Sequence, residues 1–493
     1  MILTMSTKTT KKSEMRMTVG TNNPSNQIII RSQYLREPPL QFADEREHID
    51  PKIGILRFGP KSYSPRRRHP AHVRVGFIGS AETIATTRQW MRETAKGIPG
   101  DEKHPEFPGF MGDRGFFSEL EFDEDWNAQL YQNEIENLLN TRRSRVRFET
   151  LLILLEQKLS FLSQKDQPPE YVVVALTDEL FMKCRVVNYK DRYLGDVHRD
   201  LRRAFKAAAM KYRIPTQLIR QQTVDGREKD HPSKVTWNFF AGLYFKAGGF
   251  PWGPTGLIPG TCYVGIAFYR PLGSMASTMH TSLVQAFDEH GDGPVLRGPE
   301  FNWNSEEKGS KSPHLDEDQA MTLINLVLDR YQKEMRQTPQ RVVVHKSSIF
   351  WPEEKNGFRR ALGNRVKQFD LLSLDTRQST IRLLTQSLYP PLRGTRFTIG
   401  DVDYLYTTGF IADLEQFHSI HVPSPIRVTD HIGQDTPRET LLQEILVLTK
   451  MNWNSSRLGG KSPITLRFSD LVGEIMREIP NNLDPLPQFK FYM

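Results

Sequence analysis

The chain has 493 residues, of which 38% are hydrophobic and 10% aromatic, so it is long enough for two or three domains with sizeable cores. A formal net charge of +8 favours an anionic partner, nucleic acid before membrane, with a merely solvated surface as the alternative. Only Cys184 and Cys262 are present, which excludes a disulfide framework and a cysteine-built zinc site and predicts a reducing, cytoplasmic setting. No apolar run approaches the ~18 residues of a membrane span.

The N-terminal region divides into a tail and a connecting segment. Residues 1–28 are polar and rich in Thr, Lys and Ser, which predicts a disordered tail. Residues 29–70 contain two strand-like runs, IIIRSQYLREPPLQF and IGILRFGP, and end in the basic stretch SPRRRHP. We therefore expect an N-terminal segment and linker over residues 29–70.

An α/β pattern occupies residues 71–255. Its predicted strands are HVRVGFIGS, YVVVALTDEL and IPTQLIRQQTV, and TIATTRQWMRETAKG is predicted to be a helix. Alternating strands and helices imply a parallel sheet with Rossmann-like winding. The first strand-to-helix turn reads GFIGSAET, which lacks GxGxxG spacing and disfavours a nicotinamide enzyme.

A second α/β unit follows the Gly/Pro-rich stretch GGFPWGPTGLIPG and occupies residues 256–493. Strand TCYVGIAFYR comes first, and a long amphipathic helix is predicted over DEDQAMTLINLVLDRYQKEM. The later strand candidates are RVVVHKSSIF, FDLLSLD, IRLLTQ, GTRFTIGDVDYLYTTGF and, after a helix over PRETLLQEILVLTKMNW, the strand-like PITLRFSD with a helix behind it. This order fits an RNase H-like fold.

Cationic side chains gather near the third strand of the first unit. Arg202 and Lys206 lie four residues apart and therefore share one helix face, while Gln217 lies just inside the next strand. Lys246 stands near the end of an apolar helix. Cations neutralise a phosphate and an amide donates to its oxygens, so these residues make a plausible phosphate pocket. A solvated helix face is the alternative for Arg202 and Lys206.

These stretches resemble the Argonaute family. The helix spacing, IPTQ, and KAGG followed by PW are similar to its MID domain, and EPPLQFADEREHIDPKIGILRFGP is similar to the N-terminal segment of its short prokaryotic branch. The resemblance runs from about residue 35 to Met493. It implies a Rossmann-like MID domain at 71–255 and an RNase H-like PIWI domain at 256–493.

The resemblance also implies roles for the pocket. Arg202, Lys206, Gln217 and Lys246 would hold the 5′-phosphate of a guide strand, and Arg220 would reach the first guide nucleotides. Arg202 stands where many members carry an aromatic residue, so stacking under the first base is replaced by added charge. The apolar end DPLPQFKFYM alone indicates core packing. In the family, however, the terminal carboxylate, here that of Met493, helps to hold Mg²⁺ against the guide phosphate.

Cleaving members of the family present carboxylates on strands that read roughly GID and HRDG. Here the strands read GIA, with Ala267, and HKSS, with Ser347, while Asp470 falls where a late ligand would lie. One carboxylate cannot offset the charge of a two-metal site. The prediction is a PIWI-like domain that does not cut. The GKS in RLGGKSP lacks the first P-loop glycine, because Ser455 takes its place.

The resemblance implies binding of a 5′-phosphorylated guide and recognition of complementary single-stranded DNA from plasmids or phage. The guide is expected to be RNA, with a DNA guide left open. Members of this kind work with a separate APAZ-containing effector, which carries a TIR or sirtuin-like NAD-consuming domain or a nuclease. Target binding would activate that effector, with possible assembly into a higher oligomer, and NAD depletion would follow. Two alternatives stay open: an autonomous guide-directed nuclease, and an α/β interaction protein with no nucleic-acid role.

Overall fold

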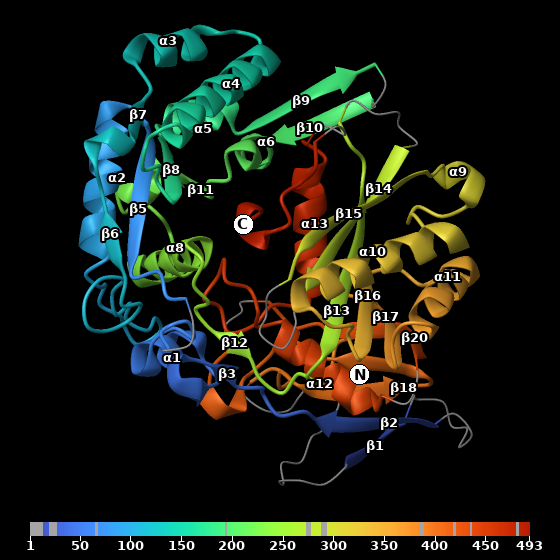
Figure 1. The fold of residues 1–493 in the computed structure, drawn as a ribbon. Helices are drawn as coiled ribbons and strands as arrows, with labels where there is room; N and C mark the ends of the chain where they lie inside the picture. The colour runs from blue at the N-terminus through green and yellow to red at the C-terminus, as the bar shows by residue number, and fades with distance from the viewer. Residues whose placement is uncertain are drawn as a thin grey trace.

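The structure is a computed structural model that describes residues 13–18, 27–64, 68–192, 195–272, 278–286, 293–377, 379–384, 389–417, 421–433, 436–479 and 483–493. Its two lobes lie side by side, with the C-terminus between them (Figure 1). One lobe contains β5 to α8 and the other contains the strands and helices from β13 onward, joined by the N-terminal segment.

The first lobe is built on a parallel sheet ordered β11-β8-β5-β6, with β7 also paired to β5. Its strands are β5 (His72–Gly79), β6 (Glu119–Glu121), β7 (Asn127–Gln129), β8 (Tyr171–Leu176) and β11 (Thr216–Arg220). Its helices are α2 (Ala81–Thr94), α3 (Gln132–Asn140), α4 (Ser144–Ser163), α5 (Asp178–Cys184), α6 (Leu201–Ala209), α7 (Gln221–Val224) and α8 (Pro232–Lys246). The parallel sheet and its three central predicted strands are confirmed.

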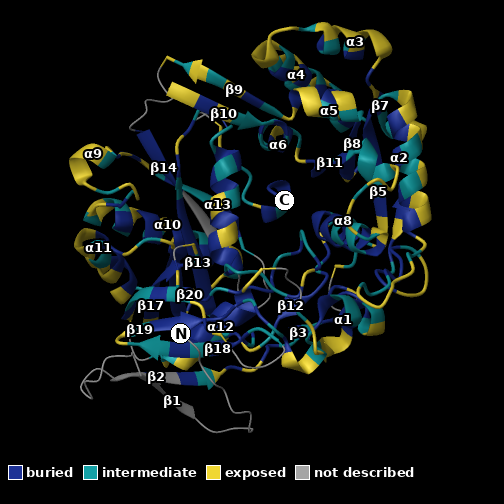
Figure 2. Ribbon diagram, turned by 180° about the vertical axis from the view of Figure 1, so that it is seen from behind, coloured by how far each residue is buried: buried dark blue, intermediate teal, exposed yellow. Residues whose placement is uncertain are grey.

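Strand β8 shows why both faces of this sheet are covered. All six of its residues are buried, and successive side chains point to opposite faces. Tyr171, Val173 and Ala175 join the core that includes residues of α2 and α8, whereas Val172, Val174 and Leu176 join the core beneath α4 and α6. Figure 2 shows the resulting pattern, with buried strands inside and exposed outer faces on α3 and α4.

The second lobe is built on a ten-stranded mixed sheet ordered β1-β2-β18-β19-β20-β17-β16-β13-β14-β15. Strands β13 (Thr261–Tyr269), β16 (Arg341–Lys346) and β17 (Gln368–Asp375) run parallel at its centre. The antiparallel strands are β14 (Thr278–Ala286), β15 (Val295–Asn302), β18 (Thr395–Ile399), β19 (Val402–Leu405) and β20 (Ile426–Gly433). This arrangement confirms the RNase H-like prediction.

Helices cover both faces of the ten-stranded sheet. One face packs against α10 (Glu317–Met335) and α11 (Pro352–Gly363), and the other packs against α12 (Arg438–Leu448) and α13 (Ile464–Met476). Short α9 (Ser305–Lys308) follows β15. A close approach sets α13 against β13, because a Cβ on Gly265 would lie 2.1 Å from the carbonyl oxygen of Thr465.

The N-terminal segment differs from its sequence prediction. Ser13–Thr18, inside the expected disordered tail, form β1, which pairs with β2 (Gln27–Tyr34), while residues 1–12 and 19–26 lie outside the described residues. Strand β2 also pairs with β18, so the N-terminal segment adds two strands to the sheet of the second lobe. Short strands β3 (Leu40–Gln41), β4 (Glu47–His48) and β12 (Gly253–Pro254) tie it to the connection between the lobes.

Three strand predictions are wrong. IGILRFGP contributes to helix α1 (Pro51–Phe58), because Asp50 caps it by accepting from the amides of Lys52 and Ile53, and Pro51 occupies its first turn. PITLRFSD lies in α13, which is buried on two sides. Its short apolar run therefore could not be told from that of a buried strand. Residues 381–384 of IRLLTQ form no strand, and the rest of that stretch lies outside the described residues.

Candidate nucleic-acid interface

The predicted phosphate residues come from three elements that meet at the inner side of the first lobe. Arg202 and Lys206 lie on α6, Gln217 lies on β11, and Lys246 is the last residue of α8. Helix α6 begins at Asp200, whose carboxylate accepts the amide of Arg203 and so fixes the first turn. Both views place the C-terminus beside these helices (Figures 1 and 2).

The structure brings two buried ammonium groups together. Lys206 Nζ donates to the carbonyl oxygen of Thr216 at 3.0 Å, and Lys246 Nζ lies 3.4 Å from that same oxygen. Lys246 also donates to Gln217 Oε1 at 2.6 Å, and Gln217 Nε2 donates to the carbonyl of Leu218 at 3.1 Å. The side chains of both lysines are almost fully buried. Three of the four predicted residues therefore form one hydrogen-bonded cluster.

The cluster carries positive charge with little to offset it. Burial lowers the pKa of Lys206 well below its usual value, and the nearby Lys246 and Arg202 charges lower this pKa further. Burial and Arg202 likewise lower the pKa of Lys246. Among the described residues, the hydrogen-bond partners of the two lysines are the Thr216 carbonyl and Gln217, and neither is a carboxylate. Unpaired buried cations are costly, so this cluster is suited to receive an anion.

The two predicted arginines differ: Arg202 lies close enough to act on both lysines, whereas Arg220 lies at the end of β11 and pairs with Glu228. Arg202 is half-buried, and burial lowers its pKa despite the nearby carboxylates of Asp200 and Glu474. The Arg220 guanidinium forms an ion pair with Glu228 at 2.5 Å, so its charge is shared with a carboxylate in the structure. Arg220 would have to leave that partner before it could contact a guide.

The C-terminal segment lies against the same helix as Lys246. Residues Phe489–Phe491 form the short helix η5, which contacts α8. The ring of Phe489 stacks on Phe468 of α13, with its centroid 3.5 Å away, and lies 6.4 Å from Phe245, the neighbour of Lys246. The side chain of Met493 is fully buried in the core that includes α8 and α13. The chain end is thus anchored between the two lobes.

The two positions expected to have lost aspartates lie on neighbouring parallel strands. Ile266 of β13 pairs with Lys346 of β16 in the last registered pair, so Ala267 and Ser347 follow it at the same edge. The adjacent Lys346 forms an ion pair with Glu354 at 2.5 Å, deep in the lobe. That buried carboxylate is already neutralised by a lysine.

Two further carboxylates near this edge are held by arginines. Asp375, at the end of β17, forms an ion pair with Arg427 at 3.0 Å and accepts the backbone amide of Arg377. Asp470, on α13, forms a solvent-exposed ion pair with the Arg377 guanidinium at 3.1 Å. The sequence prediction put Asp470 on a strand, whereas the structure puts it on helix α13.

A second cationic cavity, of about 640 Å³, was missed from the sequence. It lies between the first half of α8, the loop after β19 and the loop that joins α12 to α13. Its cationic side chains come from distant segments, and two of them are paired with carboxylates, Lys234 with Asp230 and Arg393 with Glu37. The five are Lys234, Arg393, Arg457, Lys461 and Arg467. The rejected GKS stretch lines this cavity through Gly460 and Lys461. The five cations are spread over more than 230 residues, so local spacing did not signal them.

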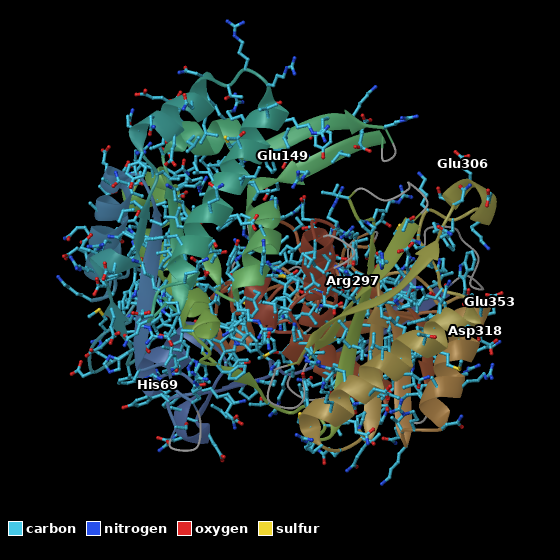
Figure 3. The ribbon with its side chains drawn as sticks, turned by 45° about the horizontal axis from the view of Figure 1, so that its top comes forward. His69, Glu149, Arg297, Glu306, Asp318 and Glu353 are labelled. Atoms are coloured by element: carbon cyan, nitrogen blue, oxygen red, sulfur yellow. The ribbon has the colours of Figure 1, made fainter. Side chains whose placement is uncertain are left out.

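Ion pairs join the two lobes next to the phosphate cluster. Arg199, just before α6, forms an ion pair with Glu478 after α13 at 2.7 Å, and also contacts Glu149 of α4, labelled in Figure 3. Arg203 of α6 pairs with Glu474 of α13 at 2.7 Å. These contacts fix the position of α6 relative to α13.

Comparison of the fold with solved structures decides the architecture. The Argonaute of Clostridium butyricum, bound to a guide DNA and a 19-mer target DNA, matches with a TM-score of 0.59 at 15% identity, over 93% of this chain and 54% of that chain. The fold is that of Argonaute proteins. A. aeolicus Argonaute (TM-score 0.57, 16% identity, 92% and 54% covered) and Drosophila Piwi (0.56, 12%, 95% and 57%) match similarly.

The Argonaute likeness concerns the MID and PIWI lobes. This chain spans about half the length of the solved Argonautes that it matches. No protein-family model matches the sequence, and no curated protein matches it. Among the described residues, the structure contains no helix both long and apolar enough to span a membrane.

Proposed function

We propose that this chain acts as a short prokaryotic Argonaute, which binds a small 5′-phosphorylated RNA guide in its MID lobe. The observation that carries the proposal is the pair of buried lysines, Lys206 and Lys246, which share the Thr216 carbonyl without a carboxylate partner. A terminal phosphate would supply the missing negative charge and several acceptor oxygens. The likeness of the fold to an Argonaute bound to guide and target DNA supports the same use of this lobe.

The guide would continue from the phosphate cluster along α8 to the second cavity. Lys246 ends α8, while Lys234 lies near its start and lines the cavity, so one helix connects the two cationic regions. Cations that contact successive phosphates hold a strand by its backbone, and the bases stay free to pair. Sequence recognition of single-stranded target DNA would then belong to the guide.

We infer that this PIWI lobe holds the guide and target without cutting. Ala267 and Ser347 carry no carboxylate at the edge where β13 and β16 end, and Asp375 and Asp470 are paired with arginines. Two metal ions in such a site need several free carboxylates, because neutral side chains cannot offset their charge. The rival function, an autonomous nuclease, would have to release both aspartates from their arginine partners.

A magnesium ion fits the phosphate cluster on the chemistry of its donors. Mg²⁺ prefers hard oxygen ligands and keeps several waters, and the short helix η5 near the chain end contacts α8, the helix of Lys246. The Met493 carboxylate would hold the ion against guide phosphates. The metal would add positive charge to the pocket, while the lysines and Gln217 orient the phosphate oxygens.

The output of target binding would come from another chain. The resemblance to short prokaryotic Argonautes implies an APAZ-containing effector with a TIR or sirtuin-like NADase domain, or a nuclease. Binding of plasmid or phage DNA would activate it, with assembly into a higher oligomer and, for an NADase, NAD depletion as the defence. Co-purification of this chain with a neighbouring effector, followed by guide- and target-dependent NAD or DNA loss, tests this proposal.

The deciding experiment compares guides that differ only in the 5′ group. Purified protein is titrated with a fluorescent RNA carrying either a 5′-phosphate or a 5′-hydroxyl, in Mg²⁺, and dissociation constants are measured. We expect the phosphate to improve affinity at least tenfold. Equal affinities for both ends would reject the proposed pocket. Absence of any nucleic-acid binding would favour the interaction-protein alternative.

A further inference from the structure

A cluster of metal-ligating side chains lies at the opposite end of α8 from the phosphate pocket. Asp101, His104 and His231 each offer one ligand atom, and these atoms all lie within 4.8 Å of one another. His231 directly precedes α8, whereas Lys246 ends it. At a rise of 1.5 Å per residue, the cluster is about 22 Å from the guide phosphate site. It is therefore separate from the phosphate pocket, at the end of α8 where Asp230 and Lys234 line the second cavity.

Hydrogen bonds hold the carboxylate of Asp101 in place next to the two histidines. Asp101 Oδ1 accepts the backbone amides of Lys103 at 2.8 Å and His104 at 2.7 Å, which fixes the carboxylate. His104 Nδ1 lies 2.9 Å from that oxygen, and His231 Nε2 lies 3.7 Å from Asp101 Oδ2. The two imidazole rings stack in parallel, with centroids 4.7 Å apart and an angle of 3°. The nitrogens therefore converge on one carboxylate.

We propose that Asp101, His104 and His231 bind a zinc ion. Two imidazole nitrogens and one carboxylate oxygen are a donor set typical of Zn²⁺, which binds each at about 2.0 to 2.2 Å and completes its tetrahedron with water. Magnesium and calcium prefer sites built from oxygens alone, so they suit this cluster poorly. Small side-chain movements bring atoms spaced within 4.8 Å to the ligand spacing of a tetrahedral site.

Binding requires a proton to move on His231. Its Nδ1 accepts the backbone amide of Ser233 at 3.2 Å, which assigns the ring proton to Nε2 in the metal-free protein. Coordination through Nε2 transfers that proton to Nδ1 and breaks the hydrogen bond from the amide of Ser233. A hydrogen bond of 3.2 Å is thus exchanged for a bond to the metal.

The zinc would join a loop to the helix that carries both cationic regions. Two hydrogen bonds already tie this loop to α8: Ser233 Oγ donates to the carbonyl of Pro105, and Trp237 Nε1 donates to the carbonyl of Glu106 at 2.9 Å. A metal bridge between residues 101–104 and 231 would add a third tie at the exposed start of the helix. Its role is to stabilise the MID lobe.

The test is titration of the chelator-treated full chain with ZnCl₂ by calorimetry. We expect one equivalent of tightly bound zinc, and at least tenfold weaker binding in His104→Ala and in Asp101→Asn. The control is His198→Ala, because His198 is exposed on β10 (Gly195–Asp200) and contacts Asn188 of β9 (Val186–Asp191) instead of a carboxylate.

Cobalt supplies a second readout that does not depend on folding energy. Co²⁺ bound in the same site should give the intense visible absorption of tetrahedral coordination, and His104→Ala should abolish it while circular dichroism stays native. The proposal is overturned if the parent chain binds no zinc, or if the His104 and Asp101 variants bind it as tightly as the His198 control.

Discussion

Replacement of Lys246 by methionine separates guide binding from folding. Methionine keeps the length and apolar stem of lysine but removes a buried ammonium that is paired with no carboxylate of the described residues. A charge-assisted hydrogen bond to phosphate contributes about 1.5 to 3 kcal/mol, so the affinity for a 5′-phosphorylated guide should fall about 10- to 150-fold. The 5′-hydroxyl guide should lose much less.

The free energy of unfolding of the Lys246→Met variant should rise or stay unchanged, although its affinity for the guide falls. In the guide-free protein, Lys246 stands close to Lys206 and Arg202, so its removal relieves repulsion between like charges. An apolar residue of similar volume can replace a poorly compensated buried charge without loss of stability. We therefore expect a midpoint of urea unfolding equal to or above that of the parent protein.

Fluorescence anisotropy with both guides, together with urea unfolding, provides the assay. Lys211→Met is the matched control, because Lys211 lies on the surface just after α6 and pairs with Glu156. The reasoning fails if Lys246→Met weakens binding of the two guides equally. It also fails if the variant loses affinity only in proportion to a loss of stability, since the lysine would then support the fold and not the phosphate.

Other predictions concern pH, the C-terminus, the positions of Ala267 and Ser347, and the ion pair between Arg199 and Glu478. The pKa values of Lys206 and Lys246 are lowered in the fold, so the guide-free protein should gain stability as pH rises toward 10.5, the usual lysine pKa. Phosphorylated guides should bind with proton uptake, measured by calorimetry, and should lose affinity over the same pH range. An extension after Met493 should impair guide loading in Mg²⁺ more than it impairs folding; unchanged loading would exclude a role for the carboxylate. Ala267→Asp with Ser347→Asp should yield at most feeble cleavage and the parent none; defined cutting by the parent would show that the positions are misassigned. Glu478→Ala should lower the free energy of unfolding, measured by urea titration, by about 2 to 4 kcal/mol, because it leaves buried Arg199 with Glu149 as its remaining partner. A loss below about 1 kcal/mol would contradict this.

Local patterns in the sequence determined most of the fold. Buried strands such as YVVVAL and RVVVHK have near-continuous apolar runs, because parallel strands are covered on both faces, and they were recognised for that reason. The predicted helices over α6, α8, α10 and α12 are also confirmed. Strands were wrongly predicted where an apolar run belongs to a helix. Asp50 and Pro51, just before IGILRFGP, start helix α1, and this capping signal in the sequence was overlooked.

The candidate site shows the same division. Four-residue spacing on α6 and the position of Lys246 at the end of α8 predicted cations that could share a phosphate, and the structure brings Lys206, Gln217 and Lys246 into one cluster. Their burial, their lowered pKa values and the shared Thr216 carbonyl appear only when β11 passes between the two helices. Charge in the sequence says which residues are ionised in water, whereas desolvation depends on what the fold places around them.

Contacts between distant segments were decided by the tertiary structure alone. The five cations of the second cavity, the pairing of β2 with β18 and the Asp101, His104 and His231 cluster each join residues far apart in the chain. A single sequence records propensity and periodicity over a few turns of helix or one strand. It does not record which surfaces meet, because that choice is made by burial of whole helices and sheets against one another.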